Sequence, residues 1–496
     1  MSQQDVIGPF GAPVPDSEEA PTLKAGELNL FDATAVAVSS VAPAYSLAAT
    51  VAAVAAVAFI HSPSIILISF VPVLFIAYAY FLLNQKDPDC GASYSWLSKL
   101  MSPYVGWFNG WVQVATSAIF CVSAPILAGT YTLQFLNSIG WISTSTSQSI
   151  WWSAIAGAIW LTFITFVCVY GIRWTTNFQW ILVIIEYVVV IGFSLWGIIK
   201  VAVSHPAGST GFHIGWFNPM TVFRDGGFNS IAIGLTLGVF FFWGWDTAVN
   251  LNEETKNSTK TPGRAGVLSM WLLLIVFCMN FVAIQMLVPQ KEIQAQGTGV
   301  LTYFADKAFG GNWAGYVMIF AVLSSTVATT QTTLLPSARI AYSMARDKVF
   351  PRVFGQIHPK FQTPALGTVV LAFFSLFGIL LSTGVHSVND LLNKLVGDIG
   401  ILVAFYYGIT GIACAWGYRK VAFQKVSFFF LGVLMPLLSG FVLLFVGFWI
   451  MKSDVGYALP DIVVLGLGIP LTIIARFVSK GDFFKTKTIA YDSIES

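Results

Sequence analysis

Two acidic residues lie in strongly apolar stretches of this chain. Asp246 directly follows the run FFFWGW, and Glu186 lies within WILVIIEYVVVIGF. A charged group in an apolar, membrane-like setting costs several kcal/mol unless it is paired or hydrated, so each acid is a candidate functional group. Asp246 could bind a cationic amine or take part in proton movement, and it could also cap a helix as its N-cap residue.

Glu186 has apolar neighbours on both sides. Burial favours the neutral form of a carboxyl group, which suits a group that loads and releases a proton. The alternative is a structural carboxyl group that is satisfied by a neighbouring hydroxyl. Lys394 and Asp398 stand four residues apart, on one face of a helix, and are expected to neutralise each other.

The elements that hold these acids are membrane helices, as the composition indicates. Of 496 residues, 56% are hydrophobic and 10% are charged, and the mean hydropathy is +0.75, whereas soluble domains carry roughly a quarter charged residues. The net charge of +2 and the spacing of the five cysteines indicate neither nucleic-acid binding nor a disulfide framework. We expect an all-α integral membrane protein with no cofactor and no metal site, because all five histidines fall in or near loops.

A window of about 20 apolar residues per span predicts twelve transmembrane helices. Most of the 25 Lys and Arg residues fall in alternate loops, which predicts that both termini are cytoplasmic in the cell membrane. The Pro-rich, acidic N-terminus has no signal-peptide pattern and is expected to be a disordered tail. The predicted spans are 32–60, 64–83, 104–136, 149–171, 175–200, 229–250, 265–288, 313–343, 364–383, 389–417, 426–451 and 458–478.

The first and sixth spans contain helix-breaking residues. Pro43 interrupts AVAVSSVAPAYSLAAT, and the sixth span, GLTLGVFFFWGWDTAVN, carries three glycines that include Gly244. Lipid tolerates unwound backbone only where it lines a protein cavity. Interrupted spans at corresponding positions of two five-helix halves indicate the substrate site of a transporter. The predicted substrate-binding residues are Ser39, Ser40, Ala42, Pro43, Ala44, Phe240, Trp243, Gly244 and Asp246.

Three stretches carry a family likeness. GWDTAVNLNEETKN resembles the sixth-helix signature of the amino acid, polyamine and organocation (APC) superfamily, and PDCGASYSWLSKLMSPYVGWFNGW looks like the stretch before its third helix. SARIAYSMARDKVFPRVFGQIHPKFQTP is similar to the family's Ala-Arg-Asp segment. The resemblance is to the bacterial amino acid/polyamine permease type. It implies a LeuT-like five-plus-five inverted repeat with helices 1 and 6 broken, in segments 1–28 (tail), 29–203, 204–420, 421–480 and 481–496 (tail).

The resemblance also implies roles for several residues. Phe240 matches the aromatic residue that closes over substrate, and Tyr94 matches a second gating position. Family members use a Gly-Ser-Gly turn in helix 1 to bind a substrate carboxylate, but this chain has Ala42-Pro43-Ala44, and proline cannot donate. That departure leaves an amine, or an amino acid with altered carboxylate contacts, as the substrate. The acid in helix 6 is similar to that of the putrescine-import branch.

Two coupling ions follow from the resemblance. By position, Glu186 corresponds to a lysine of several related permeases, which lies where sodium-coupled relatives hold an ion. Glu186 and the acid of helix 6, Asp246, are therefore the candidates for proton coupling. Ser324 and Ser325 resemble the hydroxyl pair of a sodium site, although hydroxyls also join membrane helices routinely. At the cytoplasmic helix ends, an inner charge network is expected among Glu253, Glu254, Lys256, Arg346 and Asp347.

The sequence favours a secondary transporter that imports an amino acid or a small amine or polyamine with a proton, by alternating access. An antiporter, a sodium-coupled symporter and a non-transporting nutrient sensor stay open. The sequence has neither the clustered catalytic groups of an enzyme nor the nucleotide-binding loop of a pump. Its expected partners are the substrate, protons or sodium, and the bilayer; its oligomeric state stays open.

Overall fold

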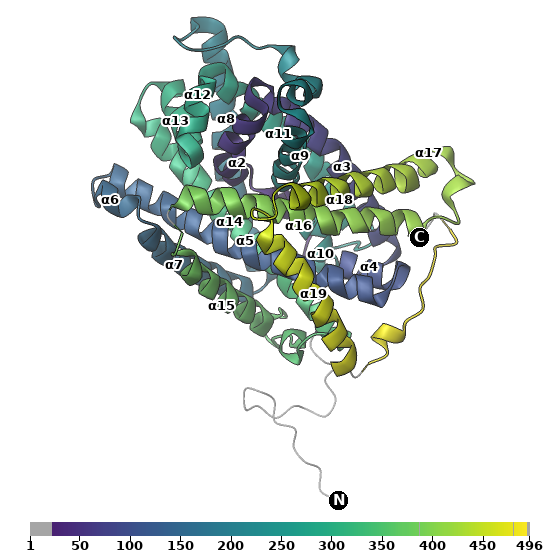
Figure 1. Ribbon diagram of the computed structural model, residues 1–496. Helices are drawn as coiled ribbons and strands as arrows, with labels where there is room; N and C mark the ends of the chain where they lie inside the picture. The colour runs from purple at the N-terminus through teal and green to yellow at the C-terminus, as the bar shows by residue number, and fades with distance from the viewer. Residues whose placement is uncertain (1–21, 386, 480, 494–496) are drawn as a thin grey trace, which may run out of the picture.

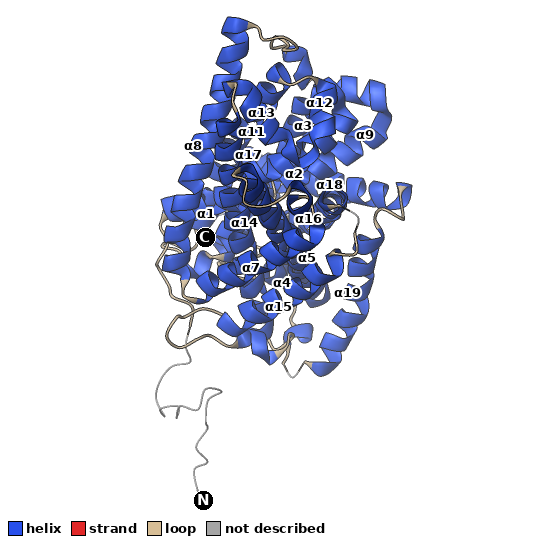
Figure 2. Ribbon diagram, turned by 90° about the vertical axis from the view of Figure 1, so that its left-hand side faces the viewer, coloured by secondary structure: helices blue, strands red, loops and turns tan. Residues whose placement is uncertain are grey.

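The computed structural model describes residues 22–385, 387–479 and 481–493. Within those ranges the fold is all-helical, and Figure 2 shows helices joined by loops with no strand. The one isolated bridge pairs Leu28 with Thr255. Residues 1–21 of the predicted tail 1–28 lie outside the described ranges. His386, one of the five histidines, also lies outside them.

Ten segments of the described chain are long and apolar enough to cross a membrane. One of them, Leu30–Lys86, contains two of the spans that the sequence predicts. The predicted span 229–250 is not among the ten; its helix runs over Pro219–Phe241, begins with the polar stretch that holds Arg224 and Asp225, and ends before residue 250. The structure therefore establishes a multi-pass all-α membrane protein.

Most long helices agree with the predicted spans to within a few residues. The exceptions are α9, which begins ten residues before span 229–250 and ends at Phe241, and α18, which begins nine residues after the start of span 426–451. The long helices are α1 (Leu30–Val41), α2 (Pro43–Ala58), α3 (Ser62–Lys86), α5 (Pro103–Ser138), α7 (Ile150–Val169), α8 (Ile172–Ser204), α9 (Pro219–Phe241), α11 (Thr261–Leu287), α14 (Asn312–Arg346), α15 (Ala365–Ser382), α16 (Val388–Gly417), α18 (Met435–Ser453) and α19 (Leu459–Val478).

Shorter helices lie mostly in the connections, where the sequence analysis placed none, but Thr247–Asn250 and Val426–Phe428 fall inside the predicted spans 229–250 and 426–451. The shorter helices are α4 (Ser93–Leu100), α6 (Thr144–Ser147), α10 (Thr247–Asn250), α12 (Gln290–Gln296), α13 (Val300–Phe309) and α17 (Val426–Phe428), with a π-helical turn over Phe429–Leu434 and 3-10 turns over Phe59–His61, Ile214–Phe217, Asn252–Glu254, Gly297–Gly299, Arg352–Gly355, Ala422–Gln424 and Phe483–Lys485.

The first membrane helix is interrupted at Ala42, between α1 and α2. Ala42 is left-handed, with φ 50° and ψ 73°, and Pro43 begins α2 at a position where its missing N–H costs no hydrogen bond. The carbonyls released at the break are bonded by side chains. Thr329 Oγ1 donates to Ser40 O at 2.6 Å, and Ser46 Oγ donates to Val41 O at 2.7 Å.

The second interruption separates α9 from α10. Residues 242–246 are not helical, and Gly244 has φ 114°, a backbone conformation that strongly favours glycine. The chain thus places a non-helical joint directly before Asp246. Both interruptions are buried inside the helical bundle, as unwound backbone at membrane depth requires.

The helices pack closely where small residues face each other. A Cβ on Gly129 of α5 would lie 2.0 Å from a backbone oxygen of α7, and one on Gly440 of α18 would lie 2.5 Å from the Gly408 oxygen of α16. In Figure 1, α16 and α18 run side by side across the middle of the molecule, and α19 crosses below them. Such small-residue contacts are typical of membrane helix pairs.

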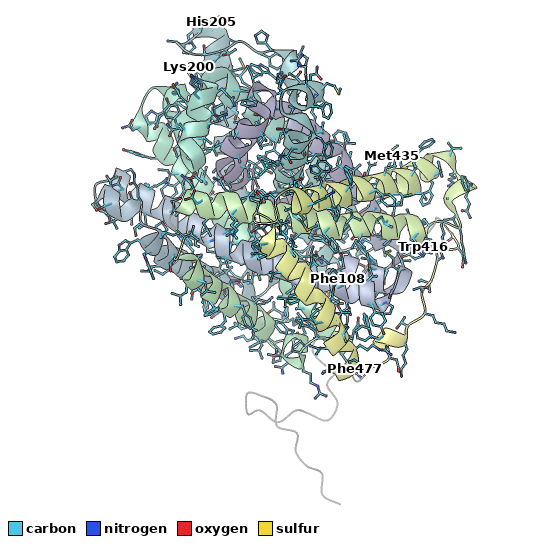
Figure 3. All side chains as sticks on the ribbon, viewed as in Figure 1. Phe108, Lys200, His205, Trp416, Met435 and Phe477 are labelled. Atoms are coloured by element: carbon cyan, nitrogen blue, oxygen red, sulfur yellow. The ribbon has the colours of Figure 1, made fainter. Side chains whose placement is uncertain are left out.

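The outer surface of the bundle is apolar. Trp416 and Phe477, labelled in Figure 3, are 51% and 81% exposed. Exposed aromatic and aliphatic side chains of this kind cover the outward faces of α7, α8, α15, α18 and α19. Because ten of the described segments are long and apolar enough to cross a membrane, these faces are the surface that would meet lipid.

The C-terminal segment runs back along the molecule. Phe483 stacks on Tyr94 with ring centroids 5.8 Å apart, and the Tyr491 N–H donates to Gly417 O at 2.9 Å. Figure 1 shows this segment passing from the end of α19 to the end of α16. At the other terminus, Leu28 is buried and its N–H donates to Glu254 O at 3.1 Å.

Candidate functional site

The two interruptions touch each other. A Cβ on Gly244 would lie 2.9 Å from the carbonyl carbon, carbonyl oxygen and hydroxyl oxygen of Ser40. The Ser40 and Thr247 hydroxyls lie 2.9 Å apart, and Thr247 Oγ1 donates to Thr332 O on α14 at 3.1 Å. Helices that are 200 residues apart in the chain therefore meet at one polar centre.

Asp246 lies at this centre and is buried, with 6% of its surface exposed. Tyr406 of α16 donates its hydroxyl hydrogen bond to Asp246 Oδ2 at 3.3 Å, and the Trp243 indole N–H donates to the same tyrosine oxygen. Asp246 is the N-cap residue of α10, but its side chain makes no capping bond. The capping role that the sequence allowed for Asp246 is therefore wrong, and its carboxylate faces a cavity.

That cavity has a volume of about 20 Å³, room for about one water molecule. Four predicted residues line it, namely Ser40, Trp243, Gly244 and Asp246. The sequence predicts that one of two mid-helix tyrosines, Tyr406 and Tyr407, lines the cavity, and Tyr406 does so. The sequence analysis missed the neighbouring lining residues Gln113, Ser117, Thr247, Asn250, Thr333, Pro336 and Ile340. Most of the missed residues are polar side chains of α5, α10 and α14.

Aromatic rings pack beside the cavity. Phe240 is buried, with ring centroids 6.1 Å from Tyr45 and 6.4 Å from Phe120, and Phe120 packs edge-on against Trp243 at 5.1 Å. The predicted gating pair is not brought together. Tyr94 lies in a separate hydrophobic cluster and donates its hydroxyl hydrogen bond to Asp347 at 2.7 Å.

Glu186 lies on the other side of the first interruption. Its Oε1 accepts from the Ala44 N–H at 2.8 Å and from Ser325 Oγ at 2.7 Å. Ser325 Oγ in turn accepts from the Tyr45 N–H at 3.0 Å. Glu186 is fully buried, and its Oε2 has no hydrogen-bond partner among the described residues. One carboxylate oxygen is thus held by α2 and α14 while the other is free to carry a proton.

These bonds account for the amides at the first interruption. The Ala42 N–H donates to Val38 O at 3.2 Å, Pro43 has no N–H, and the next two amides are used by Glu186 and Ser325. A substrate carboxylate would need at least one free amide here, since helix starts bind anions through such groups. Ala42, Pro43 and Ala44 therefore offer no unused donor.

The two serines predicted as a cation site have different surroundings. Ser325 donates to Glu186, whereas Ser324 donates to Ala321 O of its own helix at 2.9 Å. Ser39, another predicted site residue, donates to Gln179 Oε1 of α8 at 3.2 Å rather than lining the cavity. The hydroxyls around the first interruption mainly join α1, α8 and α14.

Lys394 and Asp398 form no ion pair in the described structure, although the charge of Lys394 still acts on Asp398. Lys394 is exposed, whereas Asp398 is fully buried and has no donor on either carboxylate oxygen among the described residues. Residues four apart share a helix face, but here the lysine side chain remains outside the packed interface.

Charged residues meet at one end of the bundle. Arg346 Nη2 lies 2.5 Å from Asp89 and its Nη1 lies 3.1 Å from Glu253, beside a cavity of about 390 Å³ that Phe483 helps to line. Burial alone would raise the pKa of Asp89, but the charge of Arg346 and hydrogen bonds from nearby hydroxyl and backbone groups lower it.

A second ion pair lies deeper. Arg339 is 1% exposed, and its Nε and Nη2 atoms contact the two oxygens of Glu254 at 2.5 and 2.8 Å. Two parallel bonds of this kind fix the orientation of both side chains. The predicted network is therefore present with Asp89 and Arg339 as added members, while Lys256 is exposed.

Comparison of the sequence with known proteins identifies its family. A model described as amino acid permease matches residues 28–469. The low-affinity putrescine importer PlaP of Escherichia coli strain K12 is 25% identical over 360 residues, or 70% of this chain and 72% of that protein. The vacuolar cationic amino acid transporter 4 of Arabidopsis thaliana is 24% identical over 312 residues, or 60% of this chain and 48% of its own.

A mammalian relative extends the comparison. The large neutral amino acids transporter small subunit 2 of Mus musculus is 23% identical over 337 residues, or 67% of this chain and 59% of its own. The named relatives are transporters, and enzymes are not among them. Because the family model covers most of the chain, and ten of its described segments are long and apolar enough to cross a membrane, this multi-pass membrane protein belongs to the amino acid permease family.

Proposed function

We propose that this protein imports a small amine without a carboxylate, by proton-coupled symport and alternating access. The central cavity supports this proposal, because its lining contains one carboxylate, Asp246, and no cationic side chain. An ammonium group is the natural counter-ion of a buried carboxylate, which is costly when it is left unpaired. The putrescine importer among the relatives transports such a substrate.

The substrate class rests on the amides of the first interruption. Ala44 and Tyr45 donate to Glu186 and Ser325, so no amide from residue 42 to residue 45 is left for a substrate carboxylate. Glu186 thus occupies the place that an amino acid carboxylate would need. A substrate with both an ammonium and a carboxylate would leave the carboxylate buried without a donor, which costs about 1–3 kcal/mol or more.

The coupling ion in this proposal is a proton carried by Glu186. Its free Oε2, its complete burial and its contact with α2 support the role. When Glu186 is ionised, its hydrogen bond from the Ala44 N–H is charge-assisted and therefore strong. When Glu186 is protonated, this hydrogen bond weakens and α2 is freer to move. Asp246 binds the amine and is the second candidate proton acceptor. A sodium ion at Ser324 and Ser325 is less well supported, because Ser324 bonds to its own helix.

The framework in this proposal is a twelve-helix, LeuT-like bundle in the cell membrane. Residues 29–203 and 204–420 form the two inverted repeats, helices 11 and 12 follow, and both termini are cytoplasmic. Trp243 and Phe240 close the site, and Tyr94 acts with the charged network at the cytoplasmic side. The buried interruptions and the contact of Gly244 with Ser40 support this arrangement.

The experiment compares substrates that differ only by a carboxylate. Purified protein is heated with putrescine or ornithine, and with cadaverine or lysine, and the midpoint of unfolding is followed. A ligand that binds the folded state raises apparent stability by about 2.7 kcal/mol at a hundred times its Kd. We expect the diamines to stabilise the protein and the amino acids to have little effect.

The variant Asp246→Asn identifies the counter-ion. It should fold normally and lose the stabilisation by diamines, because the amide carries no charge. Asp225→Asn, which changes an exposed aspartate, is the matched control and should keep it. Stabilisation by ornithine and lysine alone would contradict the proposed substrate class, and an unchanged response of Asp246→Asn would contradict the role of that residue.

A further inference from the structure

Two aspartates face each other between α16 and α19, away from the cavity of Asp246. Asp398 of α16 and Asp461 in the first turn of α19 are both 0% exposed. None of their four carboxylate oxygens has a hydrogen-bond donor among the described residues. The two carboxyl groups lie within hydrogen-bonding range of each other.

Two ionised carboxylates cannot make this contact. Ionised carboxylates are hydrogen-bond acceptors only. Two negative charges at such a short distance also repel each other strongly in a buried site. A proton on one group turns it into a donor, and the repulsion becomes a charge-assisted hydrogen bond. Carboxyl pairs that share a proton are a known solution to this problem in proteins.

Among the described residues, no side chain donates a hydrogen bond to either carboxyl group. The charged and titratable neighbours of the pair are Lys394, which is exposed and acts on Asp398, and Tyr457 before α19, which also lies near Asp454 at the end of α18. The Tyr457 hydroxyl packs where a Cβ on Gly397 would lie, 1.6 Å away, but gives the pair no hydrogen bond. The neighbouring cluster from α9, α16 and α18 is apolar, with Ala232, Leu235, Ile401, Val446, Ile450 and Ala458.

We propose that Asp398 and Asp461 form a proton-binding site in which one proton is shared between the two carboxyl groups and joins α19 to α16. The proton comes from water and replaces a metal ion or a basic side chain as the compensating charge. Release of the proton leaves two adjacent anions, so the two helices separate at this point. The site is distinct from Glu186 and does not depend on the substrate proposed above.

The position of the pair connects it with the central cavity. Asp398 lies eight residues before Tyr406 on α16, and Tyr406 donates to Asp246. Between them, Gly400 packs on α9, since a Cβ there would lie 2.5 Å from Thr236 O. Movement of α19 relative to α16 would therefore act on the helix that carries Tyr406, the hydrogen-bond donor to Asp246.

Infrared spectroscopy of the purified full-length protein tests the site directly, through the carbonyl band of protonated carboxyl groups. At neutral pH, Asp398→Asn and Asp461→Asn should each remove one carboxyl equivalent from that band. The double variant Asp398→Asn/Asp461→Asn should remove no more than either single one, because one proton is shared. Asp482→Asn, which changes an exposed aspartate, is the control and should leave the band unchanged.

The wild-type protein provides a second measurement if a variant fails to fold. Its protonated-carboxyl band should lose one equivalent as the pH is raised, together with a loss of thermal stability. A band that is identical in wild type and both single variants would overturn the proposal. So would stabilisation of the wild type, and not of the double variant, by added sodium or calcium ions, since a metal ion would then occupy the site.

Discussion

At the scale of single residues, the bonds of Glu186 lead to a prediction about coupling. Glu186→Gln keeps the Oε1 that accepts from Ala44 and Ser325, but it cannot release or take up a proton. We expect the variant to fold, to exchange internal for external substrate at a normal rate, and to lose accumulation driven by a pH gradient. Proteoliposomes loaded with labelled putrescine measure both activities.

The matched control is Glu292→Gln, which changes a half-buried glutamate that pairs with Lys307 outside the central cavity. It should retain both exchange and accumulation. If Glu186→Gln still accumulates substrate in response to a pH gradient, the proton is carried by another group.

The functional acids within the helices could be predicted from the sequence in part. Asp246 and Glu186 stand alone in apolar stretches, which makes their burial evident. Gln113 and Asn250 could not be predicted, because polar residues are common in helices and only packing shows which of them share a cavity. Asp461 lies in the first turn of a helix, where acids are usually structural, so its contact with Asp398 left no signal in the sequence.

At the scale of elements, the contact between the two interruptions makes Gly244 a position where no side chain fits. The left-handed backbone at Gly244 costs an alanine about 1–2 kcal/mol, and overpacking against Ser40 adds about 1–3 kcal/mol. We expect Gly244→Ala to lower the unfolding temperature and to abolish stabilisation by diamines.

Gly192→Ala is the control for this change. Gly192 lies on α8, where an added Cβ would meet nothing within 4 Å, so the substitution should be neutral or slightly stabilising. Normal diamine binding by Gly244→Ala would show that the two interruptions need not touch for binding.

The elements themselves were largely predictable, because each needs a long apolar run. The interruption at Ala42 follows from Pro43, and the one before Asp246 from its glycines. The early start of α9 at Pro219 could not be predicted, because residues 219–228 mix polar, small and apolar side chains and lie beside α3 and α18. The short helices α12 and α13 were likewise too polar for a search based on membrane spans.

At the scale of the whole molecule, the network around Arg346 closes one end of the bundle and predicts a change in cysteine reactivity. Cys90 is fully buried, and burial, together with the charges of Glu253 and Asp89, raises the pKa of its thiol well above the usual value. Arg346→Ala removes both ion pairs. If these ion pairs contribute about 1 kcal/mol, the fraction of molecules in which this end is open rises about fivefold. Maleimide labelling of Cys90 should then accelerate by up to that factor, because the loss of Arg346 also removes a charge that lowers the pKa of the thiol.

The labelling is measured in a chain with Cys278→Ser, because the other cysteines are buried. Arg224→Ala removes an exposed arginine that pairs with Asp225 and should leave the rate unchanged. An unchanged rate in Arg346→Ala would mean that the network does not hold this end closed.

The overall class of the molecule was evident from composition, and its terminal segments were not. Residues 22–28 and 481–493 contact the bundle, with Leu28 buried and Tyr491 packed on Tyr418 at 4.7 Å. Such contacts depend on surfaces that form only after the helices assemble. The number of spans in the bilayer stays a prediction, since ten segments meet the criteria of length and apolarity.

The cavity beside Asp246 has a consequence for affinity. At about 20 Å³ it is too small for any diamine, so substrate binds only to molecules in which the site has expanded. The measured Kd then equals the intrinsic value divided by the expanded fraction. With about one molecule in a hundred expanded, an intrinsic Kd of about 1 μM is measured as about 100 μM. Weak binding by this protein would therefore report how seldom the site opens, and mutations far from the cavity could change affinity without touching the substrate.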